Sequence, residues 1–240
     1  MADSIVIIPT YNERENIESI IRKVFSLSDD FHILIVDDGS PDGTGDIVKS
    51  LIPVFTGRLF IEERTGKLGL GTAYIHGFKW SLARDYSYII EMDADFSHNP
   101  EDLPRLRKAC IEGADVAVGS RYIKGVNVVN WPMSRVLMSY FASAYVRWIT
   151  GMNVQDTTAG FVCYKRAVLS TIRLDKIRFV GYAFQIEMKF TAIKHGFNLV
   201  EIPIIFTDRT AGTSKMSTRI FREAFLGVIQ MKVNSWFRKY

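Results

Sequence analysis

Residues 86–95 read Tyr-Ser-Tyr-Ile-Ile-Glu-Met-Asp-Ala-Asp, a short apolar run that ends in two carboxylates. Such a run is typical of a strand buried on both faces of a parallel sheet. Asp93 and Asp95 then stand at the carboxyl end of the strand, where open α/β sheets bind ligands. Carboxylate oxygens there suit Mg²⁺ or Mn²⁺, although the same residues would also serve as a turn before a helix from Pro100.

Similar strands alternate with helical patterns on either side of this run. Strands are expected at 4–9, 31–37, 58–62, 86–92 and 115–119, and helices at 16–27, 45–55, 71–83 and 100–112. Repeated β-α units with near-continuous apolar strands predict an α/β fold with a mostly parallel, doubly wound, Rossmann-like sheet. Farther along follow an apolar segment at 126–149, a strand at 160–164, a helix at 183–195, a strand at 199–206 and an amphipathic tail.

Two common nucleotide-binding loops are absent from the sequence. The first strand ends in Pro9-Thr-Tyr-Asn-Glu13, where a dinucleotide-binding fold would have Gly-X-Gly-X-X-Gly. No Gly-X-X-X-X-Gly-Lys-Ser/Thr loop occurs, and the glycine-rich residues 69–73 lack its lysine. These absences disfavour a Rossmann dehydrogenase and a P-loop enzyme.

The whole net charge of +4 lies in the last forty residues, which carry seven basic and three acidic side chains. This asymmetry indicates an anionic partner at the C-terminal end: phosphates, a membrane surface or nucleic acid. The rest of the composition is ordinary for a globular protein, and no signal-peptide pattern is present. Cys110 and Cys163 have no metal-binding spacing, so we expect buried free thiols in a reducing compartment.

Three polar loops are expected to meet at the carboxyl edge of the sheet. The loop at 9–13 offers an aromatic face and polar groups for a base, and the loop at 37–43 could hold a ribose. Asp93 and Asp95 would supply the metal. Each loop alone could be an Asx turn or a helix cap, but three of them after parallel strands favour a nucleotide site.

Five motifs in this order resemble family 2 inverting glycosyltransferases with the GT-A fold. They resemble most closely the dolichol-phosphate mannosyltransferase, or polyprenol-phosphate glycosyltransferase, branch. The resemblance spans about residues 4–216. The motifs are Pro9-Thr-Tyr-Asn-Glu13, Val36-Asp-Asp-Gly-Ser-Pro-Asp-Gly-Thr44, Gly69-Leu-Gly-Thr-Ala73, Met92-Asp-Ala-Asp-Phe-Ser-His98 and Gly119-Ser-Arg-Tyr122.

The resemblance implies a donor site built around a divalent cation. Asp93 and Asp95 would hold Mg²⁺ or Mn²⁺ against the diphosphate of a nucleotide-sugar. Where the family often has a third ligand, Gln, this sequence has Ser97, so the contact there is either the hydroxyl or a bridging water. The implied nucleotide pocket is lined by Pro9, Tyr11, Glu13 and Asp38.

The acceptor side is implied by basic residues farther along the sequence. Arg135, Ser139, Ser143 and Arg147 recur every four residues and would form one polar stripe on an otherwise apolar helix. The stripe alone would also fit a core helix with one solvated face. By resemblance, Arg121, Arg135 and Ser139 would bind the phosphate of a lipid acceptor.

Two further elements complete the implied mechanism. Residues 209–216 form a basic loop that would close over the donor, where Arg209 and Lys215 stabilise the leaving diphosphate. The acceptor phosphate is already anionic and needs little base catalysis, so its attack would invert the anomeric carbon. Asp156 could position a sugar hydroxyl or act as a base, or it could be a turn residue.

The tail at 217–240 is expected to be an amphipathic helix after a catalytic domain at 1–216. Docking on the protein's own core is the alternative to a membrane-interface role. Residues 133–149 are too short to span a bilayer. The expected location is peripheral, on the cytoplasmic face of a membrane, with or without a small membrane subunit. The apolar residues of the tail are interspersed with Arg219, Arg222, Lys232, Arg238 and Lys239.

The function predicted from these residues and the resemblance is transfer of a hexose, foremost mannose from GDP-mannose, to a dolichyl or undecaprenyl phosphate. One alternative is a family 2 transferase that uses a UDP-sugar, with a polyprenyl phosphate or a non-lipid acceptor. A nucleic-acid-binding module is disfavoured because the basic residues of the tail alternate with membrane-like apolar ones and not with stacking platforms.

Overall fold

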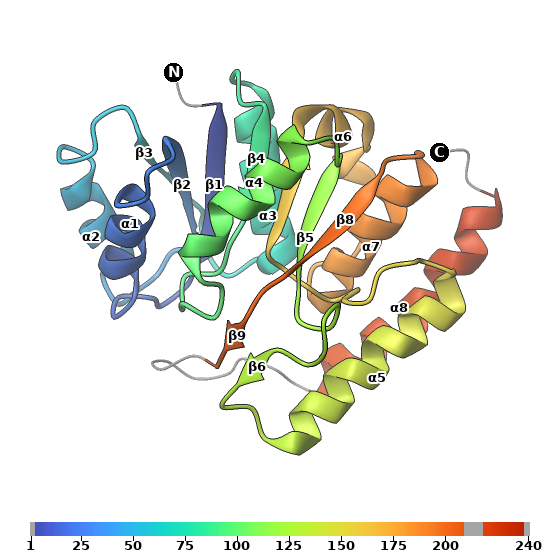
Figure 1. Cartoon of the computed structure of the whole chain (residues 1–240). Coiled ribbons are helices and arrows are strands. Elements are labelled where there is room, and N and C mark those ends of the chain that lie inside the picture. Colours follow the sequence, from blue (N-terminus) through green and yellow to red (C-terminus); the bar gives the residue numbers. More distant parts are fainter. Residues whose placement is uncertain (1–2, 209–217, 238–240) are drawn as a thin grey trace.

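The computed structural model of the chain describes residues 3–208 and 218–237, and within them seven strands form one central sheet (Figure 1). The strand order is β3-β2-β1-β4-β7-β5-β8. The antiparallel β7 lies between β4 and β5, and the other neighbouring pairs are parallel, so the predicted mostly parallel sheet is confirmed. The strands are β1 (Ser4–Thr10), β2 (Phe31–Asp37), β3 (Leu59–Glu63), β4 (Tyr88–Glu91), β5 (Val116–Ser120), β7 (Val162–Lys165) and β8 (Leu199–Pro203).

Helices cover both faces of this sheet. One face packs against α1 (Ile17–Phe25), α2 (Thr44–Leu51) and α4 (Leu103–Ile111), the last of which follows the short helix η1 (Pro100–Asp102). The other face packs against α3 (Leu70–Leu82), α6 (Arg166–Thr171) and α7 (Tyr182–Lys194), with η2 (Leu174–Lys176) between the last two. The molecule is therefore a doubly wound three-layer sandwich.

The apolar strands explain this arrangement. In β1, Val6 and Ile8 belong to the core on one face, and Ile5 and Ile7 belong to the core on the other. All four are fully buried, as expected for a strand with helices on both sides. Gly77 brings α3 close to β1, because a β-carbon there would lie 2.6 Å from Cγ2 of Ile7.

The C-terminal half adds two long helices beside the sandwich. α5 (Met133–Thr150) and α8 (Thr218–Phe237) lie side by side, with the rings of Tyr145 and Phe225 stacked 4.4 Å apart (Figure 1). The Nζ of Lys232 donates to the carbonyl of Thr150 at the end of α5 (3.0 Å), so this lysine of the tail is engaged with the protein itself. A small parallel pair, β6 (Val128–Val129) and β9 (Phe206–Thr207), lies near the start of α5.

Candidate active site

The polar loops that follow β1 and β2 are joined to each other. Asp38 donates its backbone N–H to the carbonyl of Thr10 (2.9 Å), and the hydroxyl of Thr10 donates to Asp37 (2.7 Å). The backbone N–H of Glu13 donates to the hydroxyl of Thr44 at the start of α2 (3.0 Å). Since β1 lies between β2 and β4, the three predicted loops do leave neighbouring strands at one edge of the sheet.

Asp38 is paired with an arginine that the sequence motifs did not reveal. Nε of Arg64 donates to Oδ1 of Asp38 (2.6 Å), and the backbone N–H of Leu68 donates to Oδ2 (3.2 Å). The ammonium of Lys67 lies 5.0 Å from the ring centre of Tyr11. The segment after β3 therefore closes one side of the predicted nucleotide pocket, in which Pro9, Tyr11 and Glu13 are half-buried.

The loop after β4 holds two carboxylates in defined positions. Asp95 is buried, and its Oδ1 accepts the backbone N–H (3.1 Å) and the hydroxyl of Ser97. Asp93 is half-buried, and its Oδ1 accepts the hydroxyl of Tyr74 (3.3 Å). Phe96, between Asp95 and Ser97, has a φ of 59°, a left-handed conformation that bulky residues rarely adopt. Strain of this kind is typical of ligand sites.

His98 holds the backbone of this loop in place. It is buried, stacks on Phe161 with ring centres 4.8 Å apart, and accepts the backbone N–H of Asp93 at Nδ1 (3.1 Å). Burial lowers the pKa of His98 against the opposing effect of the carboxylates of Asp93 and Asp95. A neutral ring with its hydrogen on Nε2 follows from the accepting role of Nδ1.

The loop fits a divalent cation that is shared with a substrate. Within residues 3–208 and 218–237, no three His, Cys, Asp or Glu side chains form a metal-binding group. Mg²⁺ is commonly held by one or two carboxylates together with substrate phosphates, and Asp93 and Asp95 supply that number. Oxygen donors alone also suit Mn²⁺.

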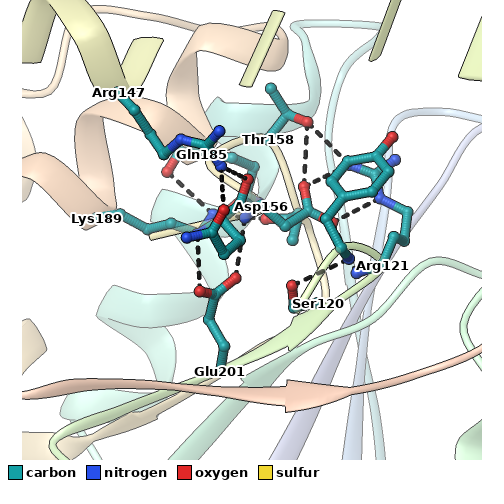
Figure 2. Close-up of polar contacts among 11 residues, drawn as sticks. Ser120, Arg121, Arg147, Asp156, Thr158, Gln185, Lys189 and Glu201 are labelled. Atoms are coloured by element: carbon teal, nitrogen blue, oxygen red, sulfur yellow. Dashed lines mark hydrogen bonds and ion pairs between the residues drawn. The ribbon is translucent and has the colours of Figure 1, made fainter. Parts of the chain in front are cut away.

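Arg121, which directly follows β5, forms a buried ion pair with Asp156 (Figure 2). Nε of Arg121 donates to Oδ2 (2.7 Å), and one terminal nitrogen donates to Oδ1 (2.6 Å) and to the hydroxyl of Thr158 (2.8 Å). Burial alone would raise the pKa of Asp156, but the charge and hydrogen bonds of Arg121 outweigh burial and lower it. The carboxylate suggested for sugar positioning therefore holds an arginine.

Aromatic rings connect the arginines to the carboxylate loop. The guanidinium of Arg121 lies 5.5 Å from the ring centres of both Trp131 and Phe206. The ring of Phe206 also lies 5.6 Å from that of His98, and Trp131 lies 4.1 Å from the guanidinium of Arg135. Arg121, Arg135 and the loop of Asp93 thus lie around one cluster of aromatic rings.

The polar stripe of α5 faces the protein, which contradicts the alternative of a core helix with a solvated polar face. Arg135 donates to both carboxylate oxygens of Asp208 (2.9 Å each), Ser143 is buried, and Arg147 donates to the carbonyl of Gln155 (3.1 Å). Ser139, one turn after Arg135, is half-buried. Arg209 and Lys215, expected to close over the donor, lie outside the described residues.

Many of the exposed side chains described on α5 and α8 are large and apolar. On α5 the exposed residues include Phe141 (63%) and Trp148 (81%), and on α8 they include Leu226 and Trp236 (68%). In the described parts of the chain, no helix combines the length and apolar character needed to cross a membrane. Both helices thus carry large apolar side chains that are exposed.

Comparison with known proteins decides the family. The model of the family described as glycosyl transferase family 2 matches residues 5–173, most of the sandwich. The chain belongs to this family. As a family 2 glycosyltransferase, it has an α/β fold of the GT-A type, as the motifs predicted.

Two curated relatives are similar over almost the whole glycosyltransferase. A polyprenol monophosphomannose synthase of Mycolicibacterium smegmatis is 48% identical over 227 residues, 95% of this chain and 86% of the relative. An undecaprenyl-phosphate mannosyltransferase of Micrococcus luteus is 44% identical over 224 residues, 93% of this chain and 91% of the relative.

Solved structures agree on the fold. Glucosyl-3-phosphoglycerate synthase from Mycobacterium tuberculosis, in complex with Mn²⁺, UDP and glucosyl-3-phosphoglycerate, has a TM-score of 0.69 at 16% identity. The match covers 100% of this glycosyltransferase and 81% of that chain. A mannosyltransferase from Pyrobaculum calidifontis with GDP-mannose and Mn²⁺ has a TM-score of 0.65 at 16% identity, covering 99% and 65%.

Proposed function

We propose that this glycosyltransferase transfers mannose from GDP-mannose to a polyprenyl phosphate, with inversion at the anomeric carbon. The observation that carries the proposal is the contact of Phe206 with both His98 and Arg121, which sets an arginine site beside the carboxylate loop. An anionic acceptor bound at that site would lie next to the donor diphosphate. The names of the two curated relatives support both the sugar and the acceptor.

On the donor side, Asp93 and Asp95 would hold Mg²⁺ or Mn²⁺, and the bound cation would supply positive charge for the diphosphate. Ser97 orients Asp95 through the hydrogen bonds described above. The nucleoside lies in the pocket of Pro9, Tyr11, Glu13 and Asp38. Arg209 and Lys215 add positive charge as the leaving group becomes more negative.

On the acceptor side, Arg121, Arg135 and Ser139 bind the lipid phosphate. Because this phosphate is already ionised, one of its oxygens attacks the anomeric carbon without a general base. The bond between that carbon and the diphosphate breaks, and GDP departs with the electron pair. Asp156 holds Arg121 in place for this step, since its carboxylate is bound to that guanidinium.

We further propose that residues 217–240, together with α5, attach the enzyme peripherally to the cytoplasmic face of a membrane. The exposed aromatic and aliphatic side chains of α5 and α8 are of the kind that insert into a lipid interface. A helix whose polar side is covered by protein and whose apolar side is open has the opposite pattern to a helix in water. Attachment would bring the arginine site to the depth of a lipid phosphate.

A panel of donors and acceptors tests the function. Purified protein is incubated with GDP- or UDP-sugars and with polyprenyl phosphate or soluble acceptors, with added Mn²⁺ or with a chelator. We expect mannosyl transfer to polyprenyl phosphate with GDP-mannose and its loss with the chelator and in Asp95→Ala. Activity with soluble acceptors alone, or with UDP-sugars alone, would contradict the proposal.

A further inference from the structure

The loop at 155–160, which carries Asp156, is held through its backbone by three charged side chains (Figure 2). Glu201 on β8 accepts two consecutive backbone N–H groups, that of Gln155 at Oε2 (2.7 Å) and that of Asp156 at Oε1 (2.9 Å). The other two contacts are made to carbonyl groups at the two ends of the loop. Arg147 donates to that of Gln155 (3.1 Å), and Lys189 donates to that of Ala159 (2.6 Å).

These three side chains come from three separate elements, α5, α7 and β8. Hydrogen bonds to charged groups are stronger than those between neutral groups, and a carboxylate that accepts two adjacent N–H groups fixes the orientation of the peptide between them. The peptide held by Glu201 joins Gln155 to Asp156. Glu201 holds the N–H of this peptide and Arg147 holds its carbonyl, so the two side chains together orient the backbone from which Asp156 leaves.

Asp156 connects this loop to Arg121 of the proposed acceptor site. Asp156 accepts the backbone N–H of Arg121 (3.0 Å) as well as its guanidinium, so main chain and side chain of the arginine are both attached to one carboxylate. A shift of Asp156 would move both. The chain of contacts runs from Glu201 through the Gln155–Asp156 peptide to the guanidinium of Arg121 (Figure 2).

We propose that Glu201 is a positioning residue for the acceptor phosphate: it holds the loop that orients Asp156 and, through it, Arg121. The proposal rests on the proposed function, in which Arg121 binds the lipid phosphate. In this role Glu201 acts through the loop backbone, to which both of the hydrogen bonds described above are made.

The test compares Glu201→Gln with Asp115→Asn. Glutamine has nearly the same shape as glutamate. Its amide nitrogen is a donor, however, and would face one of the two backbone N–H groups, so one hydrogen bond would be replaced by repulsion between two donors. Asp115 is a matched control because its carboxylate also accepts a backbone N–H, that of Asn198 (2.9 Å), at the amino end of β5 and β8 and away from the site.

In Glu201→Gln we expect the KM for polyprenyl phosphate to rise about tenfold, since a tenfold change corresponds to about one lost hydrogen bond to a charged group. The KM for GDP-mannose should stay within about twofold, since the hydrogen bonds of Glu201 lead through Asp156 to Arg121 and the acceptor phosphate. Asp115→Asn should leave both constants unchanged. Constants within twofold of wild type in folded Glu201→Gln, or equal losses for both substrates, would overturn the proposal.

A crystal structure of Glu201→Gln gives a readout that does not depend on activity. We expect the loop at 155–160 to move and the bidentate contact between Asp156 and Arg121 to be lost or lengthened. An unchanged contact would overturn the positioning role even if the wild-type enzyme proved to use another acceptor. Failure of the proposed function would show instead as wild-type protein that does not glycosylate polyprenyl phosphate.

Discussion

Arg121 and Asp156 form a bidentate ion pair in which the aspartate is entirely buried and the arginine side chain is 10% exposed. Their contacts leave little freedom to the guanidinium, so its positive charge is in place before a substrate arrives. Charge that is already oriented needs no reorganisation during the reaction, which is the main way in which enzymes stabilise charged transition states. This pair is the best-defined part of the proposed acceptor site.

Removing the negative charge of the Arg121–Asp156 pair should destabilise the folded protein. Asp156→Asn leaves the guanidinium of Arg121 without its counter-charge, and we expect the free energy of unfolding to fall by about 3 kcal/mol. Asp208→Asn is the control, because the pair of Asp208 with Arg135 is about a quarter exposed and should contribute less than about 1 kcal/mol. Urea unfolding of the three proteins measures both effects, and equal losses in the two variants would refute the assignment.

The same pair predicts how stability depends on pH. Because the folded-state pKa of Asp156 is lowered, its contribution is present above the unfolded-state pKa of about 4 and is lost as the pH falls through the folded-state value. The stability difference between wild type and Asp156→Asn should therefore be constant near pH 6–7 and shrink towards pH 3. Thermal unfolding over this range tests the sign, and a difference that grows on acidification would contradict it.

Replacing Arg64 should weaken binding of the sugar donor and leave binding of the acceptor unchanged. Its guanidinium holds Asp38 and also donates to the hydroxyl of Thr72 (2.9 Å), so Arg64→Ala should loosen one wall of the nucleotide pocket. We expect the KM for GDP-mannose to rise about tenfold while the KM for polyprenyl phosphate is unchanged. Arg84→Ala, which removes an arginine that lies over Trp80, is the control. If Arg64→Ala changed only the KM for polyprenyl phosphate, the nucleotide pocket would be wrongly assigned.

The apolar surface of α5 should bind lipid. Replacing the exposed Trp148 by Glu removes an aromatic side chain and adds a negative charge, so affinity for anionic vesicles should fall at least about tenfold. Ile111→Glu adds the same charge at an exposed apolar position on α4 and should have a much smaller effect. Vesicle sedimentation measures the affinities. Equal binding of wild type and Trp148→Glu would remove α5 from the proposed membrane surface.

The central sheet, and the edge at which its polar loops meet, could be predicted because the sequence patterns that indicate them are local. Each apolar run and each helical period lies within a few residues, and the polar loops after β1, β2 and β4 had to share an edge once the strands were parallel. The antiparallel insertion of β7 and the pairing of β6 with β9 depend on contacts between distant segments. No local pattern reports such contacts.

The partners of the site residues were missed for the same reason. The pairing of Arg64 with Asp38 and that of Glu201 with the loop at 155–156 join residues 26 to 46 positions apart. Periodicity correctly placed Arg135 and Ser143 on one stripe of α5, but it could not tell which side of the helix the protein covers. The structure shows that the polar side is the covered one.

The central claim is that a lipid phosphate, held by Arg121 and Arg135, is the nucleophile. It is tested most directly by comparing polyprenyl phosphate with the corresponding polyprenol as acceptors, using GDP-mannose and Mn²⁺ and determining the products by mass spectrometry and NMR. The account predicts a mannosyl phosphate of inverted, β configuration from the phosphate and no product from the alcohol. Equal transfer to the polyprenol, or a product of retained configuration, would contradict it.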